Sequence, residues 1–132
     1  MVIKINGCST LNTINQEFSS RYPFLRRGFY IASQDEARFK KKITDWTLSI
    51  VEAGAIVKDD EVECHYWQTT RWVERQFSKK TGLDVQLFRR YKDCWIRTDG
   101  SDILTLEEQN ELGMKDAILD TDRQGLRIQK SI

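Results

Sequence analysis

The feature that most constrains the fold of this chain is a residue pattern that occurs twice, 59 positions apart. Both copies open with an alternating segment, VIKIN at residues 2–6 and EVECHY at residues 61–66. Apolar side chains two residues apart lie on one face of a strand, so each copy is predicted to begin with a β-strand. The same offset aligns four identical pairs: Thr10 with Thr69, Phe18 with Phe77, Ser19 with Ser78, and Phe29 with Phe88.

A helix is predicted to follow the first strand of each copy. It is indicated by a polar N-cap and an apolar stripe at helical spacing: Thr10, Leu11, Ile14 and Phe18 in the first copy, Thr69, Val73 and Phe77 in the second. Pro23 disfavours the helical conformation at the residue before it, and Gly82 favours a left-handed C-cap. These two residues therefore mark the predicted helix ends.

Two further strands and a second helix complete each predicted copy. The segments are LRRGFYI (25–31), ARFKKKI (37–43) and TLSIVEAG (47–54) in the first, and DVQLFRRY (84–91), CWIRTDG (94–100) and TLEEQNELG (105–113) in the second. Thr105 and Glu108 have the spacing of a capping box, which indicates a helix start.

The sequence therefore predicts an α+β fold in which two tandem β-α-β-β-α units form one pseudo-symmetric two-layer domain. Each unit is expected to contain a three-stranded sheet with one covered face. The predicted boundaries are residues 1–54 for the first unit, 55–60 for a linker, 61–118 for the second unit, and 119–132 for a C-terminal tail or edge strand.

Charge follows the same twofold alternation, although the net charge is only +1. Basic residues outnumber acidic ones in residues 21–42 and 64–98, and acidic residues predominate in residues 43–63 and 99–122. No apolar run approaches the ~20 residues of a membrane span, and the first residues do not resemble a signal peptide. We therefore expect a soluble, cytoplasmic protein without membrane contact.

The sequence contains few of the residue combinations that metal sites and enzyme active sites require. The single histidine, His65, adjoins Cys64, and neighbours on a strand point to opposite faces, so they cannot readily bind one metal ion together. The three cysteines are Cys8, Cys64 and Cys94. Their odd number and wide spacing favour free thiols over disulfides. We expect no catalytic activity, no metal and no cofactor.

Three segments resemble a known family: VQLFR at residues 85–89, Trp95, and TLEEQN at residues 105–110. They resemble a family of small uncharacterised proteins from Bacteroides and related bacteria, in which a helix precedes a VQVFR strand, a short turn, a Trp-bearing strand and a TLEEQN helix start. The turn, often Ser-Gly-Asn in that family, is Tyr91-Lys92-Asp93 here, and Leu104 replaces an aromatic residue. The resemblance implies a bacterial or phage protein with this fold outline, and it implies no activity.

The two predicted hairpins carry arginines among aromatic residues. Phe88 and Arg90 share one face of their strand, whereas Leu87, Arg89 and Tyr91 share the other. The candidate partner-binding residues are Arg26, Arg27, Tyr30, Arg89, Arg90, Tyr91, Lys92 and Arg97. The tyrosines are preferred to Phe88 and Trp95 as stacking residues, because a hydroxyl group lowers the cost of exposure. Alternatively, Phe88 and Trp95 belong to the core, and the surrounding Arg and Lys side chains serve only to keep the surface soluble.

Two functions follow from these patterns. The first is a non-catalytic protein-binding or regulatory module, such as an inhibitor or accessory of a larger machine, whose charge blocks steer a partner. The alternative is a nucleic-acid-binding accessory protein, in which the basic aromatic hairpins hold single strands. The sequence identifies neither the partner nor the oligomeric state.

The first testable prediction concerns the core. The expected core residues are Ile3, Ile5, Leu11, Ile14, Phe18, Phe29, Val62, Val73, Phe77, Val85, Leu87 and Ile96. The substitution Phe77→Ala should lower the free energy of unfolding by about 3–5 kcal/mol, because it leaves a cavity. Urea denaturation measures this change, and a loss below about 1 kcal/mol would place the ring at the surface.

Overall fold

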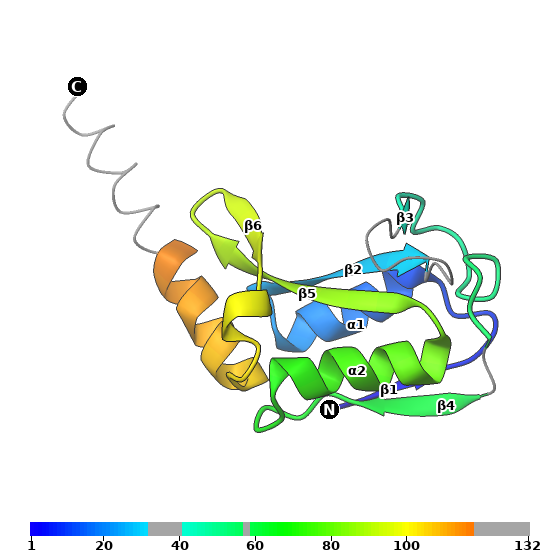
Figure 1. Ribbon diagram of the computed structural model, residues 1–132, viewed down its shortest axis with the longest axis horizontal. Helices are drawn as coiled ribbons and strands as arrows, with labels where there is room; N and C mark the ends of the chain where they lie inside the picture. The colour runs from blue at the N-terminus through cyan, green and yellow to red at the C-terminus, as the bar shows by residue number, and fades with distance from the viewer. Residues whose placement is uncertain (32–40, 57–58, 118–132) are drawn as a thin grey trace.

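The computed structural model describes residues 1–31, 41–56 and 59–117, in which the order β-α-β-β occurs twice (Figure 1). The elements are β1 (Val2–Ile5), α1 (Leu11–Arg21), β2 (Leu25–Ile31) and β3 (Lys41–Lys42), then β4 (Asp60–Glu63), α2 (Thr70–Thr81), β5 (Asp84–Tyr91) and β6 (Cys94–Arg97). A 3₁₀ turn, Asp99–Ser101, and a helix of residues 106–117 follow. The mixture of helices and antiparallel sheets agrees with the α+β prediction.

The strands are grouped differently from the prediction. β1 pairs with β4 in an antiparallel ribbon, in which Ile3 lies opposite Val62. The other strands form a four-stranded antiparallel sheet of order β3-β2-β5-β6, with Phe29 opposite Val85 at its centre. The expected three-stranded sheet in each unit is therefore wrong, because strands of the first half pair with strands of the second.

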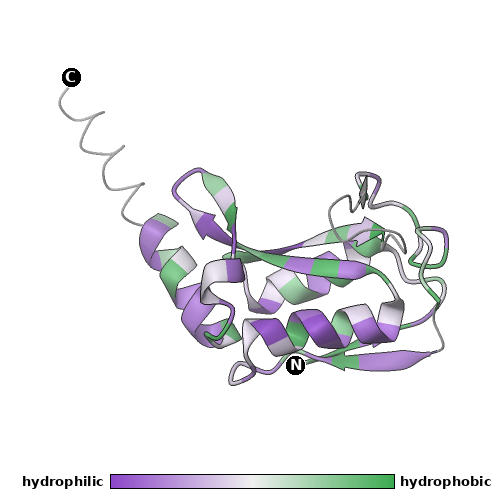
Figure 2. Cartoon of the chain, viewed as in Figure 1, coloured by the Kyte–Doolittle hydropathy of each residue, from purple (hydrophilic) through white to green (hydrophobic). Residues whose placement is uncertain are grey.

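The helices lie between the two sheets. α1 contacts β1 and β2, and α2 contacts β4 and β5. In Figure 1 both helices run between the four-stranded sheet above and the β1–β4 ribbon below. Hydrophobic and hydrophilic residues are interspersed along α2 and β5 in Figure 2, as expected where one side of an element is buried. The fold therefore has three layers, which are the four-stranded sheet, the helices and the β1–β4 ribbon, and not the expected two. The reason is that each helix contacts a strand of both sheets.

The predicted caps and breakers define both helix ends. The hydroxyl of Thr10 accepts a hydrogen bond from the backbone N–H of Thr13, and that of Thr69 accepts one from Trp72. α1 ends before Pro23, and α2 ends at Gly82, whose φ of 74° is left-handed. None of the helices in the described ranges is long and apolar enough to cross a bilayer.

The predicted second helix of the first unit is wrong. Residues 49–53 form one turn, in which Ser49 and Glu52 make a reciprocal capping box. Gly54 follows with a left-handed φ of 105°, and the N–H of Ala55 donates to the carbonyl of Ile50, which closes the turn. A glycine in this conformation ends the helix after its first turn.

The corresponding glycine of the second unit lies inside the helix of residues 106–117. A Cβ atom on Gly113 would lie 2.8 Å from Cβ of Phe24, so the missing side chain permits this helix to pack closely. The predicted tail or edge strand at residues 119–132 lies outside the described residues. So do residues 37–40 of the predicted return strand, of which β3 is the described part.

Almost all of the predicted core residues are buried. Ile96 is the exception, since it is only half-buried. The residues that the prediction missed include Tyr22, Leu25, Ile43, Ile50, Cys64, Leu83 and Leu106, and two polar residues, Arg27 and Gln109. Cys8 and Cys94 are exposed and Cys64 is buried, and all three are free thiols.

Arg27 lies in the core, so its prediction as an exposed partner-binding residue is wrong. Its side chain is 0% exposed, and its guanidinium carbon lies 3.9 Å from the ring centres of both Phe18 and Phe77. The guanidinium donates to the carbonyl of Ile14 and to Sγ of Cys64, each at 3.5 Å. The reason is strand alternation: Arg27 points toward the helices with its neighbours two residues away, whereas Arg26 points outward.

The surroundings of Arg27 are almost entirely apolar. Burial lowers the pKa of Arg27 to about 9, so the group stays charged at neutral pH. Burial also raises the pKa of the Cys64 thiol. It raises the pKa of Tyr22 to about 12, and the Tyr22 hydroxyl donates a hydrogen bond to the Cys64 carbonyl. Within the described part of the chain no carboxylate forms an ion pair with Arg27. The charge is therefore balanced by the two phenyl rings together with the Ile14 carbonyl and the Cys64 sulfur.

This arrangement predicts opposite outcomes for two substitutions at Arg27. Arg27→Ala should lower the free energy of unfolding by about 2–5 kcal/mol, because it opens a cavity between two rings. Arg27→Met fills most of that space and removes a buried charge, so its effect should stay within about 1 kcal/mol of zero or be stabilising. Urea denaturation of both variants measures the difference.

The matched control is Arg26→Met, one residue away on the exposed side of the strand. This change should alter stability by less than about 0.5 kcal/mol. If Arg27→Met were as destabilising as Arg27→Ala, the guanidinium would contribute net stability beyond the volume that it fills.

Candidate nucleic-acid interface

The side of the four-stranded sheet that faces away from α1 and α2 carries most of the cations of the two hairpins. We call it the outer face. Strand alternation and register place on it Arg26, Gly28, Tyr30, Lys42, Asp84, Gln86, Phe88, Arg90, Trp95 and Arg97. Trp46, in the segment after β3, borders the same face, since it lines one hollow with Arg26 and Lys42. Cations and aromatic rings are thus interleaved across neighbouring strands.

Arginines of the outer face pack against tryptophan rings. The guanidinium carbon of Arg26 lies 5.0 Å from the ring centre of Trp46, and that of Arg90 lies 5.5 Å from Trp95. Both distances are within the range of cation–π attraction. These contacts orient two planar cations on aromatic supports while the side chains stay partly or fully exposed.

A hollow of about 200 Å³ lies at the centre of the outer face, bordered by Trp46, Phe88 and Trp95. Gly28 is the residue that permits this shape. A Cβ atom at this position would lie 2.7 Å from a Phe88 ring carbon and 3.2 Å from a Tyr30 ring carbon. Any larger residue would displace one of these rings.

The eight residues predicted from the sequence are divided among three environments. Arg26, Tyr30, Arg90 and Arg97 lie on the outer face. Tyr91 and Lys92 lie at the tip of the β5–β6 hairpin, where the Tyr91 side chain is 39% exposed and the Lys92 ammonium is 5.5 Å from its ring centre. Arg27 is in the core. The eighth residue, Arg89, points toward the helix of residues 106–117.

Arg89 is not available as a surface cation. Its Nη1 donates to Oε1 of Gln109 at 2.9 Å, and its Cγ lies close to Gly113. Gln109 itself is buried and donates to the carbonyl and hydroxyl of Ser101. Arg89 therefore fixes the position of this helix against the sheet.

Phe88, Trp95 and Trp46 are outer-face residues that the sequence analysis did not select. Phe88 and Trp95 are half-buried, so neither is the fully buried core residue that the alternative interpretation requires. The alternation of Phe88 with Arg90 was a usable signal. No sequence pattern indicated Trp46, because its contact with Arg26 depends on the path of the chain after β3.

An acidic network borders the outer face. Asp102 forms a two-point ion pair with Arg71, with both N–O distances 3.0 Å, and this contact lowers the pKa of Asp102. Glu74 accepts from the Thr98 hydroxyl at 3.4 Å, and the Gln86 amide is placed to donate to Glu74 and Asp99. Burial, and then the nearby charge of Asp99, raise the pKa of Glu74 to about 7.

Comparisons of the chain with protein-family models, with curated proteins and with solved structures give no match. In the three described ranges, no group of three or more His, Cys, Asp or Glu side chains is arranged to hold a metal ion. The functional argument therefore depends on the chemistry of the surface itself.

The raised pKa of Glu74 predicts a pH-dependent stability. A carboxyl group with a folded pKa of about 7, above its ordinary 4.5, holds its proton more tightly in the folded state. The free energy of unfolding should then fall as the pH rises from about 4.5 to 7. Glu74→Gln, a neutral isostere, removes this loss and should be more stable than the wild type at pH 8 by about 1–2 kcal/mol, allowing for the partial exposure of Glu74.

Denaturation curves at pH 4 and pH 8 test this expectation, with Glu107→Gln as the matched control at an exposed position. At pH 4 the Glu74→Gln variant and the wild type should have nearly equal stability. A variant less stable than the wild type at pH 8 would show that the ionised carboxylate is favourable in the network.

Proposed function

We propose that this protein is a non-catalytic binding module that holds single-stranded nucleic acid on the outer face of its four-stranded sheet. The observation that carries the proposal is the interleaving of Arg26, Lys42 and Arg90 with Phe88 and Trp95 on the side of the sheet opposite to Leu25, Arg27 and Phe29, which face the helices. A cytoplasmic setting, expected from the sequence, is compatible with such a ligand.

Each component of this face matches a component of a single strand. Unpaired bases stack on aromatic rings and on arginine planes, at about 1–3 kcal/mol per base, and phosphates pair with arginine and lysine. The Arg26–Trp46 and Arg90–Trp95 pairs offer both surfaces together. Among the described residues, those that line the hollow are cations, aromatic rings and Gly28, so we expect weak sequence preference.

We also propose that the two β-α-β-β segments arose by duplication of one unit. Supporting this, the isolated bridges Thr10–Ser49 and Thr69–Thr105 occupy corresponding places in the two halves. The N–H of Leu11 donates to the Leu48 carbonyl, and the N–H of Thr70 donates to Leu104 in the same way. Pairing of β2 with β5 then brings Arg26 and Lys42 of the first hairpin and Arg90 and Arg97 of the second to one face.

Charge reversal on the outer face tests the binding proposal. The double variant Arg26→Glu, Arg90→Glu should bind random single-stranded oligonucleotides at least about tenfold more weakly, and its salt dependence should be flatter by about 1.4 in log–log slope, because two phosphate contacts are lost. Fluorescence anisotropy at several salt concentrations measures both quantities. Trp95→Leu should weaken binding by an amount equal to one stacked base, about 1–3 kcal/mol.

The matched control reverses two exposed lysines elsewhere, Lys4→Glu with Lys115→Glu, which changes the net charge by the same amount. This variant should keep most of the wild-type affinity. If the wild type binds no oligonucleotide below about 100 μM near physiological salt, where non-specific binders reach roughly 10⁻⁴–10⁻⁶ M, the proposal is wrong.

A further inference from the structure

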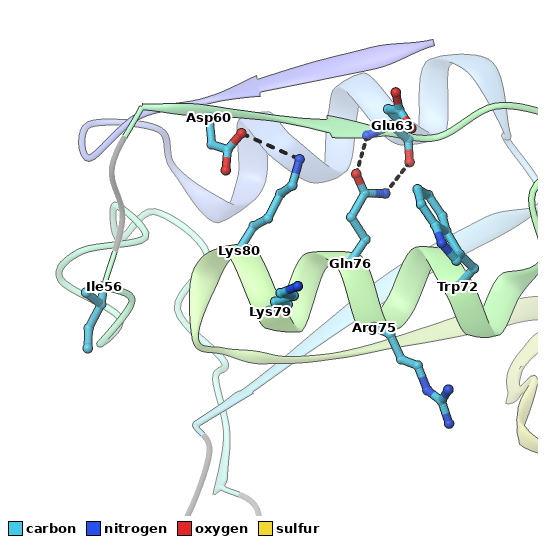
Figure 3. Close-up of a pocket in the computed structure, with 8 residues that line it drawn as sticks. All are labelled: Ile56, Asp60, Glu63, Trp72, Arg75, Gln76, Lys79 and Lys80. Carbon is cyan, nitrogen blue, oxygen red and sulfur yellow. Dashed lines mark hydrogen bonds and ion pairs between the residues drawn. The ribbon is translucent and has the colours of Figure 1, made fainter.

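A second surface, separate from the outer face, lies between α2 and β4. It is a groove of about 870 Å³ that we call the α2–β4 groove (Figure 3). One wall is formed by Trp72, Arg75, Gln76 and Lys79 of α2, and the other by β4. No part of the proposed nucleic-acid interface lines it, so its ligand is a separate question.

The backbone edge of β4 in this groove is already occupied by side chains. The amide of Gln76 bonds both main-chain groups of Glu63, accepting from its N–H at 2.9 Å and donating to its carbonyl at 2.8 Å. Lys80 donates to the carbonyl of Glu61 and forms an ion pair with Asp60 at 3.5 Å. A partner therefore cannot dock here by adding a strand to β4, and must be recognised by side chains.

The charges of the groove are unequally engaged. Asp60 is paired with Lys80, and the Glu63 carboxylate accepts from the Gln68 amide at 3.4 Å. Arg75 and Lys79 are exposed, and among the residues that the structure describes neither has a hydrogen-bond or ion-pair partner. In Figure 3 both extend from α2 without an interaction with the acids drawn. The charge left for a ligand is therefore positive.

Apolar side chains lie at the two ends of the groove. Trp72 is 43% exposed at one end, and Ile56 is 89% exposed at the other. Lys79 lies between them, whereas Arg75 extends from the side of α2 that faces away from β4 (Figure 3). Exposed large apolar residues at a concave site are typical of protein-docking surfaces. Tryptophan and arginine are also the residues that most often dominate the binding energy of an interface.

We propose that the α2–β4 groove docks an acidic segment of a partner protein, with an apolar residue against Trp72 and carboxylates at Arg75 and Lys79. The occupant follows from charge complementarity. A nucleic acid is a poorer fit, because its regularly spaced phosphates would lie along the carboxylates of β4, whereas a peptide can place its acids only beside the cations.

The test uses synthetic peptides, because the partner is unidentified. A fluorescein-labelled peptide that alternates glutamate with leucine and phenylalanine is titrated against the protein by anisotropy, beside an oligo-glutamate and a lysine-for-glutamate version. The mixed acidic peptide should bind the most tightly, at least about fivefold above oligo-glutamate, because it can bury an apolar side chain that oligo-glutamate lacks. The lysine version should not bind.

Variants locate the site. The double charge reversal Arg75→Glu, Lys79→Glu should weaken peptide binding at least about tenfold, and Trp72→Ala should reduce it to the level of oligo-glutamate. The matched control, Arg26→Glu with Arg90→Glu, should leave peptide binding unchanged, which separates this test from that of the nucleic-acid proposal. Circular dichroism checks that each variant is folded.

Several results would overturn the inference. It is wrong if no acidic peptide binds the wild type at low salt, or if the groove variants bind as well as the wild type. It is also wrong if these variants lose oligonucleotide binding instead, which would make the groove a nucleic-acid site. A self-association abolished by the same variants would make the occupant a second copy of this chain.

Discussion

The contact of Arg27 with Phe18 and Phe77 connects the three layers of the molecule. Its backbone belongs to β2, its guanidinium lies between a ring of α1 and a ring of α2, and its last hydrogen bond reaches Cys64, the residue after β4. Placing an ion in such a site costs several kcal/mol. Two desolvated cation–π contacts at about 2 kcal/mol each, and hydrogen bonds to a charged donor, are of similar size. The contact therefore adds little net stability. Its effect is on the arrangement of the elements, because the buried charge of Arg27 on β2 has both of its ring contacts only when α1 and α2 lie on either side of it.

How far the sequence predicts the fold depends on the range of the interactions involved. Caps, breakers and apolar stripes act within a few residues, and Thr10, Thr69 and Gly82 mark the helix ends found in the structure. The paired strands, in contrast, come from segments about sixty residues apart in the sequence. No local signal indicates that β1 pairs with β4 rather than with a strand of its own unit. The turn at residues 49–53 shows that a local helix-start signal does not by itself give a full helix. A capping box of Ser49 and Glu52, which the sequence analysis did not identify, starts this turn, but the left-handed Gly54 ends it at once.

The candidate site shows a similar limit at the level of single residues. Arg26 and Arg27 are adjacent and chemically identical, and strand alternation assigns one to the surface and the other to the core. The phase could be read from the sequence, since Phe29 is an expected core residue and Arg27 lies two positions before it on the same face of the strand. What the sequence does not show is that a guanidinium can be accommodated there, because that depends on Phe18 and Phe77 from the two helices. Arg89 was misplaced for the same reason, because its inward position is acceptable only where Gln109 meets it.

The two proposed surfaces use cations in physically different ways. On the outer face Arg26 and Arg90 lie over indole rings, which restricts their rotamers and presents flat, oriented guanidinium groups. Such groups suit planar ligands and repeated phosphates, because little conformational entropy is lost when they bind. In the α2–β4 groove, no aromatic ring among the described residues packs against Arg75 or Lys79, so the proposed ligand would have to restrict their rotamers. For the proposed ligand, this entropy loss would make affinity depend on the apolar contacts at Trp72 and Ile56, so such a ligand needs acidic and apolar groups on the same segment.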